Sequence, residues 1–480
     1  MTSSRAIDVA ALIEGRKLSS FNYLIICVSV LITFLDGFDL LMLSHTAAYM
    51  ADEIGLDKLQ LGNIFSIGLF GMMLGGFFFG YLGDRIGRRP TIILSTSAFG
   101  VLTLLFTFAD SYASLLVLRF LNGFALGAML PLCWALNIEF VPKRYRASVI
   151  TIIMVGFSLG GAAAGPLTVW LAPQYGWASV FVLGGIATLL SSVLLFFTLP
   201  ESVRFLVSRQ KQPQTVVRIL RRLDPSIDVR AGDRYFLADE IDIGRQPFRV
   251  GQLFIGKLKW ITPMIWIGFG ASSMAMYFLA SWSPLVYQYA GFDRATASWV
   301  SSFASFSGAM AGLVLMRVVD TRGPYAVMIY PLLSLPFLLV LGIGDLQGNA
   351  FIALSMVGAI FVKGSHYGIT SIAGIFYPSA IRGNGAGWAA SMGKFGSVCG
   401  PLLGAYVLNS GMPVVKSFAV LALCPAVLGV CVFTVARIEK RATRAEMLNA
   451  DNCPTPDSAA TSADIVAPQG ARQPVEPREA

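Results

Sequence analysis

Charged residues are scarce in this chain. Asp, Glu, Lys and Arg make up 13% of its 480 residues, whereas about 25% is usual for soluble domains. Apolar residues make up 55%, and the mean hydropathy is +0.67. Apolar runs of about 20 residues recur, long enough to span a hydrocarbon core of about 30 Å. Core helices of soluble proteins are shorter and amphipathic, so we predict a polytopic membrane protein.

Residues that serve catalytic and metal sites are also few. The sequence has two histidines and six cysteines, without a CxxC pair. Five of the cysteines lie in long apolar runs, where apolar packing is their expected role. The sequence has no nucleophile elbow, no metal-spaced histidine cluster and no phosphate-cradling loop. We therefore expect neither an enzyme nor a metal site.

The apolar runs predict an all-α protein of twelve transmembrane helices. The predicted spans are 22–44, 61–82, 91–109, 112–135, 148–171, 178–199, 260–281, 297–317, 325–344, 350–372, 384–408 and 414–436. They divide the chain into a lead-in (1–21), an N-terminal six-helix bundle (22–199), a central loop (200–259), a C-terminal six-helix bundle (260–436) and a tail (437–480). The tail is rich in Pro, Ala and Ser without periodicity, so we expect disorder. The N-terminus lacks the pattern of a cleaved signal peptide.

Lys and Arg fall on one side of this topology. With the N-terminus inside, internal segments carry 30 of the 36 basic residues and external loops carry three. Positive charge favours cytoplasmic loops, so both termini are expected in the cytoplasm. The net charge of +9 is then explained by anionic lipid, without a nucleic-acid partner.

The two predicted bundles share motifs at a constant offset. Asp84 and Asp320 are 236 residues apart, and so are Arg146 and Arg382. A third pair, GAAAGP at 161–166 and GSVCGP at 396–401, is 235 apart. These repeats indicate a duplicated six-helix unit, typical of transporters whose site lies at the midplane between the two halves.

Two acids interrupt the first apolar run, in the stretch FLDGFDLLML (34–43). An ionisable residue at mid-bilayer depth costs about 2.5–3.5 kcal/mol on insertion scales, so Asp36 and Asp39 are functional candidates. At i and i+3 they share a helix face, and Gly37 leaves room for a backbone or a substrate. Repulsion between two carboxylates favours proton uptake by one of them, which suits proton coupling. The alternative is a structural pair that is hydrogen-bonded to neighbouring helices.

Cations lie inside other spans. Arg119 could pair with a first-helix aspartate or hold an anion. Lys363, His366 and Tyr367 stand at i, i+3 and i+4 near the middle of one span, and Lys394 lies inside the next. We predict that these five residues bind a carboxylate substrate, with His366 in substrate contact or proton handling.

His45 lies at the end of the first predicted span. We expect it to be a wetted residue at the membrane interface.

The loop after the second span carries a family resemblance. Its sequence GYLGDRIGRR resembles the loop motif of the major facilitator superfamily, and the P-x-x-x-R copies resemble a later motif of that family. A carboxylate at a helix end, beside arginines, can pair with a neighbouring helix and latch one conformation; alternatively, the arginines only anchor the loop. The predicted latch residues are Gly80, Asp84, Arg85, Gly87, Arg88, Glu139, Arg146, Asp320 and Arg382. In the second copy Thr321 replaces the arginine.

The stretch Asp36-Gly-Phe-Asp39 resembles the D-G-x-D of first helices in the aromatic acid:proton symporters, bacterial uptake permeases of the 4-hydroxybenzoate and benzoate type. The resemblance implies a multi-pass protein of the inner membrane, probably wrongly named an enzyme by none of its motifs, which imports an aromatic carboxylate. It also implies coupling at Asp36 and Asp39, energy from the proton gradient without a cofactor, and a monomer. Lys394 departs from that family, where arginine is common.

Other functions stay open on the sequence. Two cations in the second half could suit a dicarboxylate such as muconate or a phthalate-type acid. An efflux antiporter is a second alternative, although the glycine pair after Pro166 that such proteins carry is missing. A membrane chemoreceptor for the same acids is a third, although no signalling or DNA-binding segment is evident.

Overall fold

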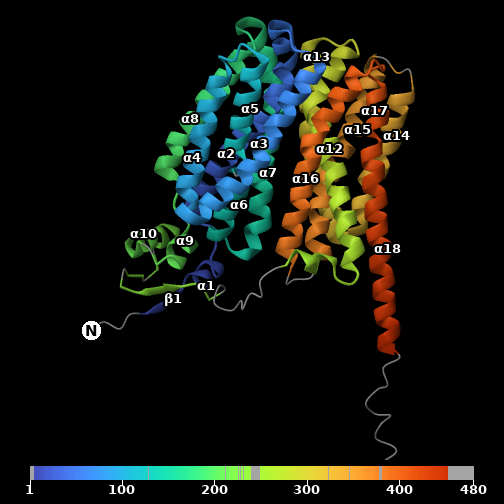
Figure 1. Ribbon diagram of the computed structural model, residues 1–480. Coiled ribbons are helices and arrows are strands. Elements are labelled where there is room, and N and C mark those ends of the chain that lie inside the picture. The colour runs from blue at the N-terminus through green and yellow to red at the C-terminus, as the bar shows by residue number, and fades with distance from the viewer. Residues whose placement is uncertain are drawn as a thin grey trace, which may run out of the picture.

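Two helical bundles stand side by side in the computed structural model (Figure 1). The structure describes residues 5–127, 129–210, 212–224, 226–227, 229–230, 232–238, 249–322, 324–344, 346, 348–377 and 381–451. The N-terminal bundle consists of α2 (Ser20–Ile54), α3 (Lys58–Ile86), α4 (Arg88–Phe106), α5 (Tyr112–Leu126), α6 (Met129–Phe140), α7 (Lys143–Tyr175) and α8 (Ala178–Thr198). The C-terminal bundle consists of α12 (Leu258–Tyr289), α13 (Arg294–Arg322), η2 (Pro324–Met328), α14 (Ile329–Ile343), α15 (Gly348–Phe376), α16 (Arg382–Asn409), α17 (Lys416–Leu421) and α18 (Leu423–Asp451).

Within the described residues, eleven helical segments are long and apolar enough to cross a membrane, with α5 and α6 forming one of them. The remaining predicted span, 384–408, lies in α16, whose glycines, polar residues and Lys394 lower its hydropathy. The count of twelve therefore stays a prediction.

Several helices continue past their predicted ends. The first span was expected to end at residue 44, but α2 reaches Ile54. Gly55 then ends it in the left-handed conformation at φ 76°, which glycine adopts without a steric penalty. Hydropathy marks the hydrocarbon layer, whereas backbone hydrogen bonding and caps decide where a helix ends.

The lead-in and the central segment fold together, so the expectation of a purely helical protein needs correction. A two-stranded parallel sheet joins β1 (Ala6–Asp8) to β2 (Arg234–Phe236). It is followed or preceded by the short helices of these two segments, α1 (Val9–Glu14), α9 (Val203–Ser208), α10 (Pro213–Leu223) and η1 (Val250–Phe254). Strands of three residues with distant partners leave no detectable periodicity.

The expected disorder from residue 437 is wrong up to Asp451, because α18 continues to that residue. Its last part, RIEKRATRAEML, consists largely of good helix formers, which a search for apolar runs overlooks. Residues 452–480 lie outside the described part of the chain.

The packing of the two bundles repeats with the offset found in the sequence. Gly160 of α7 lies against the backbone carbonyl of Phe34 in α2, and Gly396 of α16 lies against that of Gly270 in α12. Both members of the second pair are 236 residues after those of the first. Glycine at these positions lets helix backbones approach closely, so the repeat conserves the closest contact within each bundle.

Alanine at Gly160 should therefore separate α2 from α7. A Cβ atom there would collide with backbone rather than with a flexible side chain, and overpacking typically costs about 1–3 kcal/mol. We expect Gly160→Ala to lower the melting temperature of the purified protein. Gly387→Ala, on α16 with open space around the glycine, should not. Equal melting temperatures for the two variants would contradict this packing.

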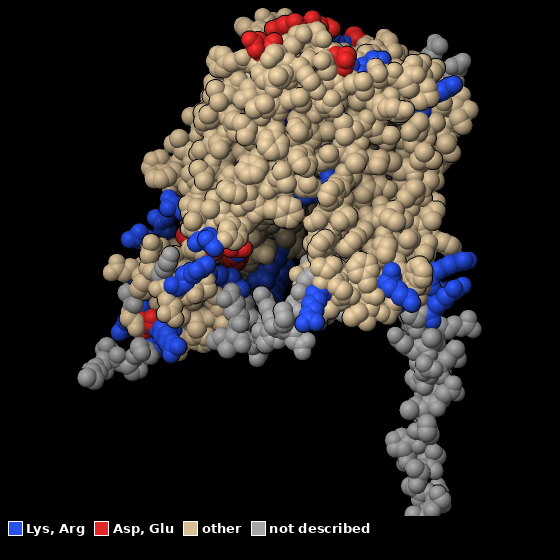
Figure 2. Space-filling model, in the orientation of Figure 1, with Lys and Arg blue, Asp and Glu red and all other residues tan. Residues whose placement is uncertain are grey.

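The two ends of the molecule differ in charge. Lys and Arg gather at the end that carries α9 and α10, here called the basic face, and Asp and Glu gather at the other end, the acidic face (Figure 2). The N-terminal segment and the end of α18 both lie at the basic face (Figure 1). The molecule is hollowed between its halves toward the basic face (Figure 2).

Candidate substrate and proton site

The two acids of the first helix are buried inside the N-terminal bundle. Asp36 and Asp39 each expose 1% of their surface. Asp39 Oδ2 accepts a hydrogen bond from Arg119 Nη1 of α5 at 2.8 Å. Asn122 accepts a second one from the same nitrogen at 3.3 Å and donates to Thr103 Oγ1 at 2.8 Å. Of the two roles considered for Arg119, the structure shows the pair with an aspartate.

Asp36 differs from Asp39 in its surroundings. Within the described part of the protein, neither of its carboxylate oxygens has a hydrogen-bond partner. The alternative of a structural pair hydrogen-bonded to neighbouring helices thus does not describe Asp36. Burial of an ionised carboxylate without a partner is costly, so Asp36 is a place where a proton can be held.

Gly37, between the acids, is a packing position. A Cβ atom here would collide with the backbone carbonyl of Phe157 in α7. The close approach that the sequence left open is therefore made by a backbone. It fixes the acid-bearing turn of α2 against α7.

A small cavity between the two halves contains Lys363 and Tyr367 of α15. Its other walls come from α2, α7, α12 and α13, and include Gly37 and Ser158. Lys363 Nζ donates a hydrogen bond to Ser305 Oγ of α13 at 2.7 Å. The cavity volume is about 40 Å³, whereas an apolar cavity of about 150 Å³ holds benzene. An aromatic ligand would therefore require the walls to move apart.

The other predicted substrate residues do not line this cavity. His366 Nδ1 lies 3.3 Å from Ser272 Oγ of α12. Lys394 reaches from α16 to the N-terminal bundle, where a methyl group on Gly76 would come within 2.7 Å of its Nζ. Arg119 lies with Asp39. The five residues thus occupy four places, and their roles stay predictions.

The expectation for His45 is wrong. Its side chain exposes 2%, and Nε2 lies 3.5 Å from Ser302 Oγ of α13, in the other half. The error follows from the predicted helix end, since α2 continues beyond residue 44 and carries His45 into the packed interior.

Ser302 and Ser305 of α13 were missed as partners of His45 and Lys363. The signal was present, because the run SSFASFSG (301–308) places several hydroxyls in an otherwise apolar span. Their spacing of three residues puts both serines on one helix face.

The halves are joined toward the acidic face. Arg294 of α13 forms an ion pair with Asp52 of α2, and its guanidinium lies 4.4 Å from the ring centre of Tyr49. Lys58 Nζ of α3 donates to the Leu408 carbonyl of α16 at 2.9 Å. With the hollow on the other side (Figure 2), these contacts describe a conformation that is closed toward the acidic face.

Loss of the Arg294–Asp52 pair should favour opening of the acidic face. Both side chains are partly exposed, and such pairs contribute about 0–1 kcal/mol, so we expect Arg294→Gln to shift the equilibrium by at most about fivefold. Hydrogen exchange at the ends of α2 and α13 should become faster. Lys416→Gln, an exposed cation at the start of α17, is the control; equal exchange in both variants would contradict a gating role.

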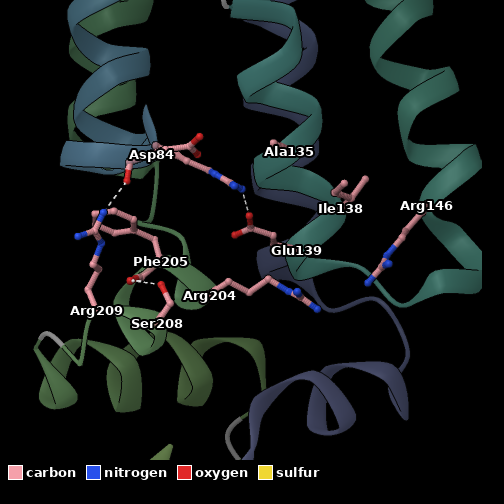
Figure 3. Close-up of a pocket in the computed structure, with 10 residues that line it drawn as sticks. Asp84, Ala135, Ile138, Glu139, Arg146, Arg204, Phe205, Ser208 and Arg209 are labelled. Atoms are coloured by element: carbon pink, nitrogen blue, oxygen red, sulfur yellow. Dashed lines mark hydrogen bonds and ion pairs between the residues drawn. The ribbon is translucent and has the colours of Figure 1, made fainter. Parts of the chain in front are cut away.

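The predicted latch residues form part of a charged cluster at the basic face (Figure 3). Arg88 makes an ion pair with Glu139 of α6, and Glu139 accepts a hydrogen bond from Ser202 Oγ. Arg209 Nη2 donates to the Asp84 backbone carbonyl at 3.3 Å. Glu139 therefore pairs with Arg88 rather than with another charge of its own loop.

The remaining latch residues lie apart from that pair. Arg146 Nε donates to the Val141 carbonyl at 3.1 Å, and Arg85 stacks on Tyr81 at 4.7 Å. Gly80 has open space where a Cβ atom would stand. The side chains of Asp320 and Arg382 lie outside the described residues.

Glu201 was missed by sequence reasoning. Its carboxylate accepts hydrogen bonds from the backbone nitrogens of Arg88 and Arg89 at 2.9 and 3.2 Å, and thereby caps the start of α4. Gly87, directly before this helix, has a φ of 107°, a conformation that favours glycine. The glycine of the loop motif therefore has a backbone role.

Comparison with known proteins agrees with this architecture. Residues 29–362 match the model of the Major Facilitator Superfamily. The chain is 30% identical to the 4-hydroxybenzoate transporter PcaK of Acinetobacter baylyi, over 90% of this chain and 95% of that one. It is also 30% identical to the gallate transporter of Pseudomonas putida, over 92% and 97%.

Solved structures agree on the fold. The xylose transporter XylE from E. coli, in a partially occluded inward-open conformation, superposes with a TM-score of 0.66 at 19% identity and covers 87% of this chain and 98% of that one. The relatives are transporters, which confirms the expectation that the protein is not an enzyme. The chain belongs to the Major Facilitator Superfamily, within its family of aromatic acid transporters.

Proposed function

We propose that this protein is a proton-coupled symporter that imports an aromatic monocarboxylate of the benzoate or hydroxybenzoate kind. It would act in a bacterial inner membrane, with its basic face in the cytoplasm. The relatives named above transport 4-hydroxybenzoate and gallate. The observation that carries the proposal is the unpartnered, buried Asp36, directly beside a glycine that lines the cavity of Lys363.

Asp36 is the proposed proton site. A proton on this carboxylate removes its repulsion with Asp39, which stays paired with Arg119. Because Gly37 fixes this turn of α2 against α7 and also lines the cavity between the halves, a change of charge at Asp36 alters the surface across which the halves move. Proton and substrate occupancy would thereby favour the same conformational change.

Lys363 is the proposed carboxylate ligand. Its ammonium group now donates to Ser305 Oγ, and a substrate carboxylate could take the place of this hydroxyl as a charge-assisted acceptor. Tyr367 offers an aromatic face in the same cavity. Lys394 lies against Gly76 instead, so the two lysines do not form one dicarboxylate site in this conformation. This separation favours a monocarboxylate over muconate or a phthalate.

Uptake by membrane vesicles tests the function. Vesicles containing the full chain are given radiolabelled benzoate, 4-hydroxybenzoate, gallate, muconate, phthalate or xylose, with and without an inward proton gradient. We expect gradient-dependent accumulation of an aromatic monocarboxylate. Accumulation of no aromatic acid, or equal accumulation without the gradient, would contradict the proposal. Binding without transport would indicate a receptor, and export would indicate an antiporter.

Removal of the Lys363 charge should weaken substrate binding. Hydrogen bonds to charged groups contribute about 1.5–3 kcal/mol, so Lys363→Gln is expected to raise the half-saturation concentration by about 10- to 150-fold. Lys416→Gln removes an exposed lysine from α17 and should leave it unchanged. An unaltered half-saturation in Lys363→Gln would remove this residue from the site without contradicting transport itself.

A further inference from the structure

A second pocket lies at the basic face, between the N-terminal bundle and α9 (Figure 3). Its volume is about 440 Å³, within the range of about 300–1,000 Å³ typical of small-molecule sites. Its charged lining residues are Arg88, Arg146, Arg204, Arg209, Asp84 and Glu139. We call it the arginine pocket. It is separate from the cavity of Lys363, with which it shares no lining residue.

The arginines reach this pocket from separate elements. Arg88 begins α4, Arg146 stands in the first turn of α7, and Arg204 and Arg209 belong to α9 and its C-cap. The side chains of Arg146 and Arg204 extend toward one another into the pocket (Figure 3). Like charges directed into one space repel each other, and an anion between them would convert this repulsion into attraction.

The carboxylates of the pocket do not balance its arginines. Glu139 makes an ion pair with Arg88 and accepts a hydrogen bond from Ser202. Arg209 donates to the backbone carbonyl of Asp84. Counted over the lining, four guanidinium groups face two carboxylates. The surplus of two positive charges matches a dianion better than a monocarboxylate.

We propose that the arginine pocket binds a phosphate group, carried by a soluble phosphate or by a phospholipid headgroup. Guanidinium groups match phosphate oxygens in bidentate geometry, and several of them together favour a doubly charged ligand. The bound group would connect α9 to the first turns of α4 and α7. It would therefore hold the segment that follows the N-terminal bundle against the bundle itself.

A binding titration on the full chain tests the site. The protein is purified in a phosphate-free buffer and titrated calorimetrically with inorganic phosphate and glycerol 3-phosphate. In parallel, its melting temperature is compared in nanodiscs of phosphatidylcholine with and without phosphatidylglycerol. Saturable binding of a soluble phosphate supports a soluble ligand. A rise in melting temperature with phosphatidylglycerol that depends on Arg204 supports a lipid headgroup.

Variants assign the binding to this pocket. We expect Arg204→Gln to weaken the binding at least about tenfold or to abolish the lipid effect, whereas Arg218→Gln, on exposed α10, leaves both unchanged. Arg209→Gln provides a second variant if Arg204→Gln fails to fold, as judged by gel filtration. The proposal is overturned if neither phosphate source has an effect, or if the pocket variants and Arg218→Gln respond alike.

Discussion

Asp36→Asn is expected to abolish proton-driven accumulation of substrate while the protein still reaches the membrane. An amide has nearly the shape of the carboxylic acid but cannot take up or release a proton. Asp36 is buried and without a hydrogen-bond partner among the described residues, so the neutral amide should be tolerated by the fold. Accumulation against a gradient should fall to the level of vesicles that lack the protein.

Two controls define this result. Asp110→Asn removes a carboxylate that is exposed in the loop before α5 and should leave accumulation unchanged. Exchange of labelled for unlabelled substrate across the membrane needs no net proton movement, so it should survive in Asp36→Asn. Full accumulation by Asp36→Asn would exclude Asp36 as the coupling site.

Arg119→Gln is expected to have the largest effect on stability. The Arg119–Asp39 pair is buried, with a nitrogen–oxygen distance of 2.8 Å. Removal of one member of a buried ion pair costs about 3–5 kcal/mol, because the other charge is left uncompensated. Asp39 would then face Asp36 without a cation. We expect a large fall in the melting temperature of the purified protein.

A second substitution separates the pair from other effects of Arg119. In Arg119→Gln/Asp39→Asn no uncompensated charge remains, so a substantial part of the lost stability should return. The double-mutant cycle then yields a clearly favourable coupling between the two side chains. Additive losses would show that Arg119 stabilises the fold through contacts other than Asp39.

Much of the fold could be predicted from the sequence because the bilayer constrains it strongly. A segment in hydrocarbon must satisfy its backbone hydrogen bonds internally, so apolar runs became helices, and the constant offset of 236 residues indicated the repeat. The caps beyond the hydrocarbon were less visible, as the extension of α2 to Ile54 shows. The pairing of β1 with β2 depends on residues far apart in the chain and gave no local signal.

The site could be predicted only in its components. Burial cost singles out Asp36, Asp39, Arg119 and Lys363, and helical spacing places the two acids on one face. Which groups meet across helices depends on packing: Lys394 lies against Gly76 in the other half, and Lys363 contacts Ser305. Such contacts follow from the tertiary arrangement rather than from spacing along one helix.

Proton movement during substrate entry tests the central claim most directly. Vesicles in weakly buffered medium, without an imposed gradient, receive a concentrated aromatic acid that supports uptake, and the external pH is recorded. We expect the external medium to become more alkaline as the acid enters through the wild-type protein, and no change in pH with Asp36→Asn. Protein-dependent entry of the acid in the wild type without alkalinisation would contradict proton-coupled symport.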